Sequence, residues 1–256
     1  MKFLIQKIDK EIRHDFSFTL LESIRYNNWL FNGIEMKCKF INSTNANELT
    51  FWDFKDFHEN YVPVGSVEFV LGYMRWFEIE QPKPLNVPDE LIPYANRYIY
   101  NCNHMDLENP PLDRYFIKSA DKIKGTAGII NKDEPITLSA GNYQVSNVID
   151  IESEWRCFVY KGELVGIQNY SGDFTAFPDV NKIRMMIKDF KSAPIAYTLD
   201  VGTNSIDRSD TMKRTFIIEC HDFFSCGLYG FADHRIYPHM LQRWFTEYKQ
   251  KNNIMF

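Results

Sequence analysis

The spacing of apolar and polar residues predicts the elements of the first part of the chain. Apolar and polar side chains alternate through Lys2 to Ile8, which is typical of a strand, and apolar residues recur at helical spacing through His14 to Trp29. A second strand is expected at Glu35 to Phe40. Ser66 stands where it would cap a helix that runs to about Phe77. A strand, a helix and another strand in this order favour an α/β layer.

The stretch from Gln81 to Pro93 contains four prolines. Proline lacks a backbone N–H and fixes φ, so this stretch cannot continue a helix or a central strand, and we expect it to act as a stiff connector. We therefore place a domain boundary there, with one domain at 1–93 and a second domain at 94–256.

The second domain is expected to be rich in short strands, because β-branched and aromatic runs alternate with turn residues. A Lys161-Gly162 turn joins two of these strands into a hairpin. The predicted strands lie at 96–100, 115–118, 143–151, 154–160 and 163–167, and the predicted helices lie at 180–190 and 239–251.

Acidic residues gather where two further strands are expected to face each other, in the segment 196–231. Ile217, Glu219 and His221 would share one face of the second strand, and Asp200 at the end of the first would lie opposite that face. Carboxylates held this close repel each other unless a cation neutralises them, which predicts a site for Mg²⁺. The alternative is an ordinary solvated hairpin, since any half-exposed sheet carries polar pairs.

Three basic residues are candidates for binding phosphate. Lys118 ends a predicted strand, and Lys124 lies in the following loop beside two glycines, where small residues let backbone N–H groups approach phosphates. This loop matches no P-loop, and solvated loop lysines are the alternative. Arg156 shares a strand face with Glu154 and is placed to fork onto a carboxylate or a phosphate.

Composition and charge narrow the class of protein. Hydrophobic residues make up 45% of the 256 residues and charged residues 25%, as in folded globular proteins. A net charge of −5 argues against partners engaged through bulk positive charge, such as nucleic acid or an anionic membrane. The five cysteines show no CxxC pairing, which favours a reducing compartment. Charged residues interrupt the apolar residues at the N-terminus, where a signal region would have to be apolar. We therefore expect a cytosolic protein without a membrane span.

The order of these elements resembles the ATP-grasp superfamily, and more narrowly the small R2K-type proteins of phages and bacteria. The resemblance covers nearly the whole chain. It implies an α+β fold in which two α+β subdomains grip ATP, a lysine-bearing one at about 112–150 and a metal-bearing one at about 151–256, after a small α/β pre-ATP-grasp domain. It rests on four segments: PVGSVEFV from residue 63, IKSADKIKGTAG from residue 117, SEWRCFVYKGELVG from residue 153, and the LDVG and IIECHDFFSCGLYGF pair.

The resemblance also implies roles for individual residues, with ATP and Mg²⁺ as cofactors and Mn²⁺ as an alternative cation. Lys118 and Lys124 would contact the ATP phosphates, and Arg156 the γ-phosphate or an acyl-phosphate. Most ATP-grasp enzymes have Asn where this chain has His221, and an imidazole suits Mn²⁺ or Zn²⁺ better than Mg²⁺. The remaining implied contacts are the adenine at the backbone of Asn147, Val148 and Ile149, the ribose at Glu154, and the metal at Asp200, Glu219 and His221.

The implied reaction is an ATP-dependent ligation. A carboxylate would be activated as an acyl-phosphate, and an amine would then attack to give an amide or peptide bond. The substrate would be a small molecule or peptide, whose identity the sequence leaves open together with the oligomeric state. Two alternatives remain: a degenerate ATP-grasp protein that binds a nucleotide or partner without catalysis, and a structural zinc module built from Cys220, His221, Cys226, His234 and His239.

Overall fold

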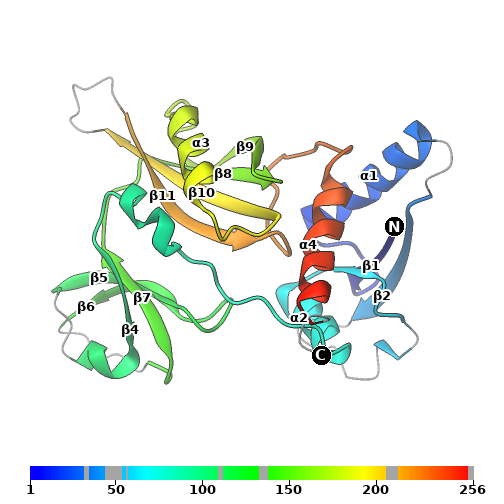
Figure 1. The fold of residues 1–256 in the computed structure, drawn as a ribbon, viewed down its shortest axis with the longest axis horizontal. Coiled ribbons are helices and arrows are strands. Elements are labelled where there is room, and N and C mark those ends of the chain that lie inside the picture. Colours follow the sequence, from blue (N-terminus) through cyan, green and yellow to red (C-terminus); the bar gives the residue numbers. More distant parts are fainter. Residues whose placement is uncertain are drawn as a thin grey trace. The chain divides into compact units, whose positions relative to one another are not determined.

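The chain forms two compact units, which Figure 1 shows as ribbons. The computed structural model describes residues 1–31, 35–43, 54–55, 57–108, 112–132, 138–205 and 213–252. The first unit comprises Met1–Pro82, Pro194–Ala196 and Phe223–Phe256, and the second comprises Lys83–Ala193 and Tyr197–Asp222. These units group residues by contact, and the division of the sequence at residue 93 stays a prediction.

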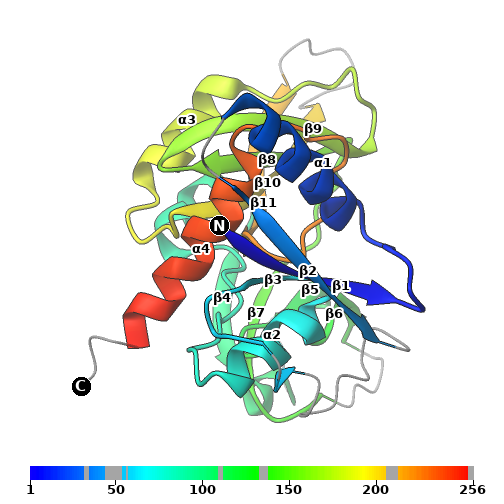
Figure 2. The ribbon, with the colours of Figure 1, turned by 90° about the vertical axis from the view of Figure 1, so that its right-hand side faces the viewer.

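The first unit contains the predicted α/β layer. Its sheet is parallel with the order β2-β1-β3, and the arrows of β1 and β2 point in the same general direction in Figure 2. Phe3, Leu4 and Ile5 in the central strand are fully buried, as expected of a parallel strand covered on both faces. The elements of this unit are β1 (Lys2–Ile8), α1 (Asp15–Leu30), β2 (Lys37–Ser43), β3 (Val62–Val64), α2 (Val67–Trp76) and α4 (Tyr237–Asn252).

Helix α2 begins where the sequence predicts. The Ser66 hydroxyl accepts a hydrogen bond from the Phe69 backbone N–H at 3.1 Å, which satisfies one of the unpaired donors of the first turn. The Ser66 N–H donates to the buried Gln6 side chain at 2.7 Å. The cap therefore joins the start of this helix to strand β1.

Helix α4 packs with the N-terminal residues. The Tyr237 hydroxyl donates to the Phe16 carbonyl at 3.0 Å, and the Phe245 ring lies 6.0 Å from the Tyr73 ring between centroids. Trp244 is fully buried. The apolar face of this C-terminal helix thus completes the core of the first unit, although the predicted sequence division places it in the second domain.

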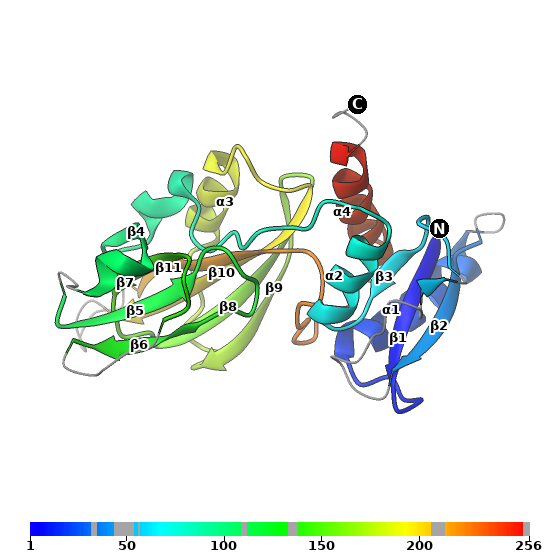
Figure 3. The same ribbon diagram turned by 90° about the horizontal axis from the view of Figure 1, so that it is seen from below.

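The second unit consists of two four-stranded antiparallel sheets, seen together in Figure 3. The strand orders are β4-β7-β5-β6 and β11-β10-β8-β9. Its elements are η2 (Asp89–Tyr94), β4 (Ile99–Asn103), η3 (His104–Glu108), β5 (Arg114–Ser119), β6 (Ala127–Asn131), β7 (Asn142–Asn147), β8 (Ser153–Tyr160), β9 (Glu163–Gly172), α3 (Val180–Asp189), β10 (Ala196–Ser205) and β11 (Lys213–Asp222).

One face of the sheet β11-β10-β8-β9 is covered by helices. Ile183 and Met186 of α3 and Leu91 of η2 form a single core with Trp155 and Cys157 of β8. Side chains alternate along a strand, so Arg156, between these two residues, points to the opposite face. That face carries the candidate site.

The predicted β8 to β9 hairpin is confirmed. Lys161 and Gly162 form its turn with φ of 53° and 75°, which is the left-handed backbone that a two-residue hairpin turn requires.

In the described part of the chain, no helix has the length and hydropathy needed to cross a bilayer.

Candidate functional site

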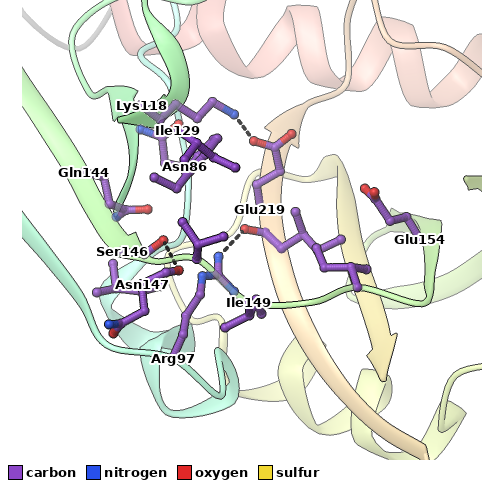
Figure 4. A pocket seen from close by; sticks show the side chains of 15 residues that line it. Asn86, Arg97, Lys118, Ile129, Gln144, Ser146, Asn147, Ile149, Glu154 and Glu219 are labelled. Atoms are coloured by element: carbon purple, nitrogen blue, oxygen red, sulfur yellow. Dashed lines mark hydrogen bonds and ion pairs between the residues drawn. The ribbon is translucent and has the colours of Figure 1, made fainter. Parts of the chain in front are cut away.

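A cavity of about 320 Å³ lies within the second unit (Figure 4). The backbone segment after β7, Asn147 to Ile149, forms part of its wall, and its contact with adenine stays a prediction. Its apolar lining comes from Ile99, Phe116, Ile129, Val148, Ile149, Ile151 and Ile218, and its polar lining comes from Asn86, Arg97, Lys118, Gln144, Ser146, Asn147, Glu154 and Glu219.

The two predicted metal carboxylates face each other across β10 and β11. Asp200 pairs with Glu219 in the strand register, and the register then shifts between Asp200 and Val201. This shift is a β-bulge, in which two residues of β11 oppose one of β10. The predicted face of Ile217 is wrong because of this bulge. Ile217 packs in the core, whereas Ile218 and Glu219 both line the cavity.

Asp200 is held by a bidentate ion pair. The Arg156 Nε donates to Asp200 Oδ1 at 2.9 Å, and the Arg156 Nη2 donates to Oδ2 at 2.7 Å. Side-chain exposure is 10% for Arg156 and 1% for Asp200. Two parallel hydrogen bonds between buried charges fix the orientation of both groups.

Glu219 contacts two side chains. One carboxylate oxygen is paired with the Lys118 ammonium, from strand β5 of the other sheet of this unit (Figure 4), and the other oxygen lies 2.6 Å from His221 Nε2. Burial lowers the pKa of Lys118 to about 8, with Asp200 opposing this effect, so the ammonium remains mostly charged at neutral pH. Lys118 and Glu219 each keep about a quarter of their side chain exposed, at 25% and 23%.

His221 completes the cluster. Its Nε2 lies 3.9 Å from Asp200 Oδ2, and one ligand atom from each of Asp200, Glu219 and His221 lies within 4.8 Å of the other two. Burial lowers the pKa of His221 to about 4, an effect that Asp200 opposes and Lys118 reinforces. The imidazole is therefore neutral at physiological pH and retains a lone pair.

Glu154 lies at the cavity wall next to Tyr170. The Tyr170 hydroxyl donates to Glu154 Oε2 at 2.7 Å, and the Arg156 guanidinium lies 5.7 Å from the Tyr170 ring centroid. Burial raises the pKa of Tyr170, and the negative charge of Asp200 adds to this shift. Tyr170 thus stays protonated and orients the Glu154 carboxylate.

Lys124 does not join the other predicted residues. It lies in the turn between β5 and β6 with a φ of 55°, is exposed, and is not among the residues that line the cavity. Its contact with a nucleotide stays a prediction.

Arg97 is a cavity residue that sequence reasoning missed. Arg97, labelled in Figure 4, donates to the Ile217 carbonyl at 2.7 Å and to the Ile218 carbonyl at 3.0 Å, the two carbonyls at the bulge next to Glu219. Burial lowers the pKa of Arg97 to about 10. No local sequence pattern predicts these contacts of Arg97, because Ile217 and Ile218 lie more than a hundred residues away in the sequence.

Asn86 and Gln144 were also missed. The Asn86 carbonyl accepts from the Cys220 N–H at 2.6 Å, and its side chain donates to the Ser119 carbonyl at 3.0 Å. Gln144 accepts from the Val87 N–H at 3.0 Å and donates to the Val87 carbonyl at 2.9 Å. The proline-rich connector, residues 81–93, is therefore bonded to β5 and β7 of one sheet and to β11 of the other. These bonds hold Lys118 of β5 and Glu219 of β11 at contact distance.

Comparisons with known proteins identify a related family and related folds. A family model described as "ATP-grasp domain, R2K clade family 2" matches residues 94–238, more than half of the chain. This chain belongs to that ATP-grasp family. The predicted α+β ATP-grasp fold is therefore confirmed, together with the resemblance on which it was based.

One solved structure with a TM-score above 0.5 shows the same fold at low sequence identity. The N5-carboxyaminoimidazole synthetase from Staphylococcus aureus is 9% identical, covers 86% of this chain and 69% of its own, and gives a TM-score of 0.53. The D-alanine–D-alanine ligase from Bacillus anthracis is 9% identical, covers 99% of both chains and gives a TM-score of 0.49. A search of curated proteins found no match.

The cavity of this ATP-grasp chain fits a nucleotide in its chemistry. Isoleucines suit the faces of a purine ring, backbone groups at 147–149 suit its hydrogen-bonding edge, and the Lys118 ammonium is a group of the kind that pairs with phosphates. Asn86 adds a buried side-chain oxygen that has no hydrogen-bond partner among the described residues. A buried acceptor without a donor is costly, so a ligand that donates there would be stabilised.

The carboxylate and imidazole cluster fits a divalent cation. Two carboxylates and a neutral imidazole are donor groups for such ions, and Asp200, Glu219 and His221 are the only group of three metal-ligating side chains found in the described ranges. The zinc alternative fits less well, because Cys220 is fully buried in the helix-covered core, away from His221.

Proposed function

We propose that this protein is an ATP-dependent carboxylate–amine ligase. The observation that supports it most is the convergence of Lys118, Arg156, Asp200, Glu219 and His221 beside an apolar cavity in a chain of the ATP-grasp family. Transfer of a phosphoryl group requires that negative charge be neutralised by groups already in place, and this cluster offers both cationic side chains and ligands for a cation.

The proposed reaction has two steps. A substrate carboxylate oxygen forms a bond to the γ-phosphorus of ATP, and ADP leaves. A substrate amine then forms a bond to the carbonyl carbon of the acyl-phosphate, phosphate leaves with the bonding electrons, and the amine nitrogen releases a proton. No side chain of the protein needs to form a covalent bond in this sequence.

Each residue of the site has a task in this proposal. Lys118 binds phosphate oxygens after exchanging its contact with Glu219, because an ammonium can pair with either anion. Arg156 orients Asp200 through two hydrogen bonds and contributes charge toward the transferring group. Glu154, held by Tyr170, accepts the ribose hydroxyls. Asp200, Glu219 and His221 hold a divalent cation, which supplies charge neutralisation when bound.

One observation favours a second candidate, a protein that binds nucleotide without turning it over. Both oxygens of Asp200 are already bonded by Arg156, and His221 occupies the third ligand position. These features weaken the site as a ligand set for Mg²⁺, which prefers oxygen.

A product assay distinguishes the two candidates. The protein is incubated with ATP, a divalent cation and mixtures of amino acids, short peptides and small amines, and the products are identified by mass. We expect ADP, phosphate and one amide in equal amounts, all absent from the Lys118→Ala variant. Nucleotide binding without any substrate-dependent ADP would favour the binding protein, and formation of AMP would contradict the acyl-phosphate route.

A further inference from the structure

The third ligand of the candidate cation site is a nitrogen. His221 and Glu219 lie on the same strand face two residues apart, and the imidazole Nε2 is 2.6 Å from Glu219 Oε1. His221 keeps 35% of its side chain exposed, while Asp200 is almost fully buried. His221 therefore has the most exposed side chain of the three, ahead of Glu219 at 23%.

The two carboxylates of the site are already compensated by cations of the protein. Arg156 pairs with Asp200, and Lys118 pairs with Glu219. Without nucleotide, two positive and two negative side chains leave the cluster with little net charge to attract a cation. Mg²⁺ gains mainly from charge and from oxygen ligands, so this arrangement offers it little.

An imidazole ligand changes which metal the site binds more tightly. Its lone pair adds affinity without adding charge, and imidazole nitrogen is a better ligand for first-row transition metals than for Mg²⁺. Cys220 and Cys157 are fully buried in the core, so no thiolate from them competes for a softer ion.

We infer that the cation site formed by Asp200, Glu219 and His221 selects a first-row transition metal, with Mn²⁺ as its representative, over Mg²⁺. This inference rests on the proposed nucleotide function and narrows it to one class of cation. In the neutral imidazole the single proton then lies on Nδ1, so that Nε2 is free to bind the metal. Glu219 Oε1, which now accepts from Nε2, becomes available as the neighbouring ligand.

The test compares metals with a nucleotide that is not hydrolysed. Calorimetry measures the affinity of the full chain for AMP-PNP at equal free concentrations of Mg²⁺ or Mn²⁺. We expect the affinity to be about tenfold or more higher with Mn²⁺, and the ratio to approach one in His221→Asn, which replaces the nitrogen ligand by an amide oxygen. His104→Asn is the matched control, because His104 does not line the cavity, and it should keep the wild-type ratio.

A spectroscopic measurement detects the ligand itself. Electron spin-echo modulation of Mn²⁺ in the AMP-PNP complex should show a directly bound nitrogen in the wild type and in His104→Asn, and should lose it in His221→Asn. Both experiments include the wild type, so a folding defect in the variant cannot hide a negative result.

The outcomes separate this inference from the proposed function. Equal AMP-PNP affinity with both metals, together with no nitrogen modulation in the wild type, would overturn the metal selectivity and leave the nucleotide function standing. Failure of the wild type to bind AMP-PNP with either metal would overturn both.

Discussion

The two ion pairs of the site are built differently. Arg156 and Asp200 form a bidentate pair that is almost fully buried, both on the sheet that α3 covers. Lys118 and Glu219 come from two different sheets and form a pair with about a quarter of each side chain exposed. Both pairs contain groups that the proposed site would use, but the second pair is the more exposed of the two.

Because the two ion pairs differ in burial, we expect them to have different roles. Separating two buried charges leaves each without a partner in a medium that solvates it poorly, so the first pair is a fixed part of the fold. An exposed pair is weak because water and salt compete with it, so the second can exchange partners when a nucleotide arrives. We therefore expect stability to depend mainly on the first pair and ligand binding mainly on the second.

The largest effect is expected from Asp200→Asn. This change leaves the Arg156 guanidinium buried without its counter-charge, which costs about 3–5 kcal/mol of unfolding free energy. It also removes a ligand of the cation, so ligation should fall by about a hundredfold or more. Chemical denaturation and the product assay measure the two losses.

A double variant sharpens this prediction. Arg156→Met combined with Asp200→Leu replaces the buried pair by apolar side chains, and such replacements are often neutral for stability. We expect the double variant to regain most of the lost stability while remaining inactive. An unchanged midpoint of denaturation in Asp200→Asn alone would show that the first pair does not stabilise the fold.

Lys118→Ala should show the opposite pattern. The loss of a partly exposed ion pair should change the unfolding free energy by no more than about 1 kcal/mol. Affinity for AMP-PNP should fall by roughly tenfold to a hundredfold, since a charged hydrogen bond to phosphate is worth about 1.5–3 kcal/mol. Lys188→Ala on helix α3 is the control, and equal calorimetric affinities for the two variants would contradict the assignment of Lys118.

Arg97→Lys tests whether the bulge positions Glu219. A lysine keeps the positive charge but cannot donate in a fork to the carbonyls of Ile217 and Ile218. We expect the affinity for the cation in the nucleotide complex to fall by about threefold to tenfold, in keeping with other groups that orient metal ligands. Free guanidinium should partly restore binding to Arg97→Ala. A lower stability of Arg97→Lys without any change in cation affinity would indicate a purely structural role.

Sequence patterns predicted the parts of this site that depend on local order. Alternation along a strand and the register of a hairpin place Asp200 opposite Glu219, and both are properties of neighbouring residues. The same alternation gave the wrong face for Ile217, because a bulge shifts the pattern and has no reliable local signal.

Contacts between distant segments were not predictable from local patterns. The connector at Asn86 was expected only to separate domains, yet it bonds to both sheets of the second unit. Arg97 acts on carbonyls that become available only once the bulge has formed. Helix α4 looks the same in sequence whichever core it completes, because its apolar face carries no information about its partner.

The most direct test of the central claim is a thermal melt of Glu219→Gln beside the wild type, with and without a divalent cation and AMP-PNP. Without ligand, the melting temperatures should differ little, because the pair with Lys118 is weak. With the complex of cation and AMP-PNP at about a hundred times its dissociation constant, the wild type should gain about 2.7 kcal/mol, or roughly 5–10 °C. Glu219→Gln should lose most of that gain, and an undiminished shift in this variant would contradict a cation site at Glu219.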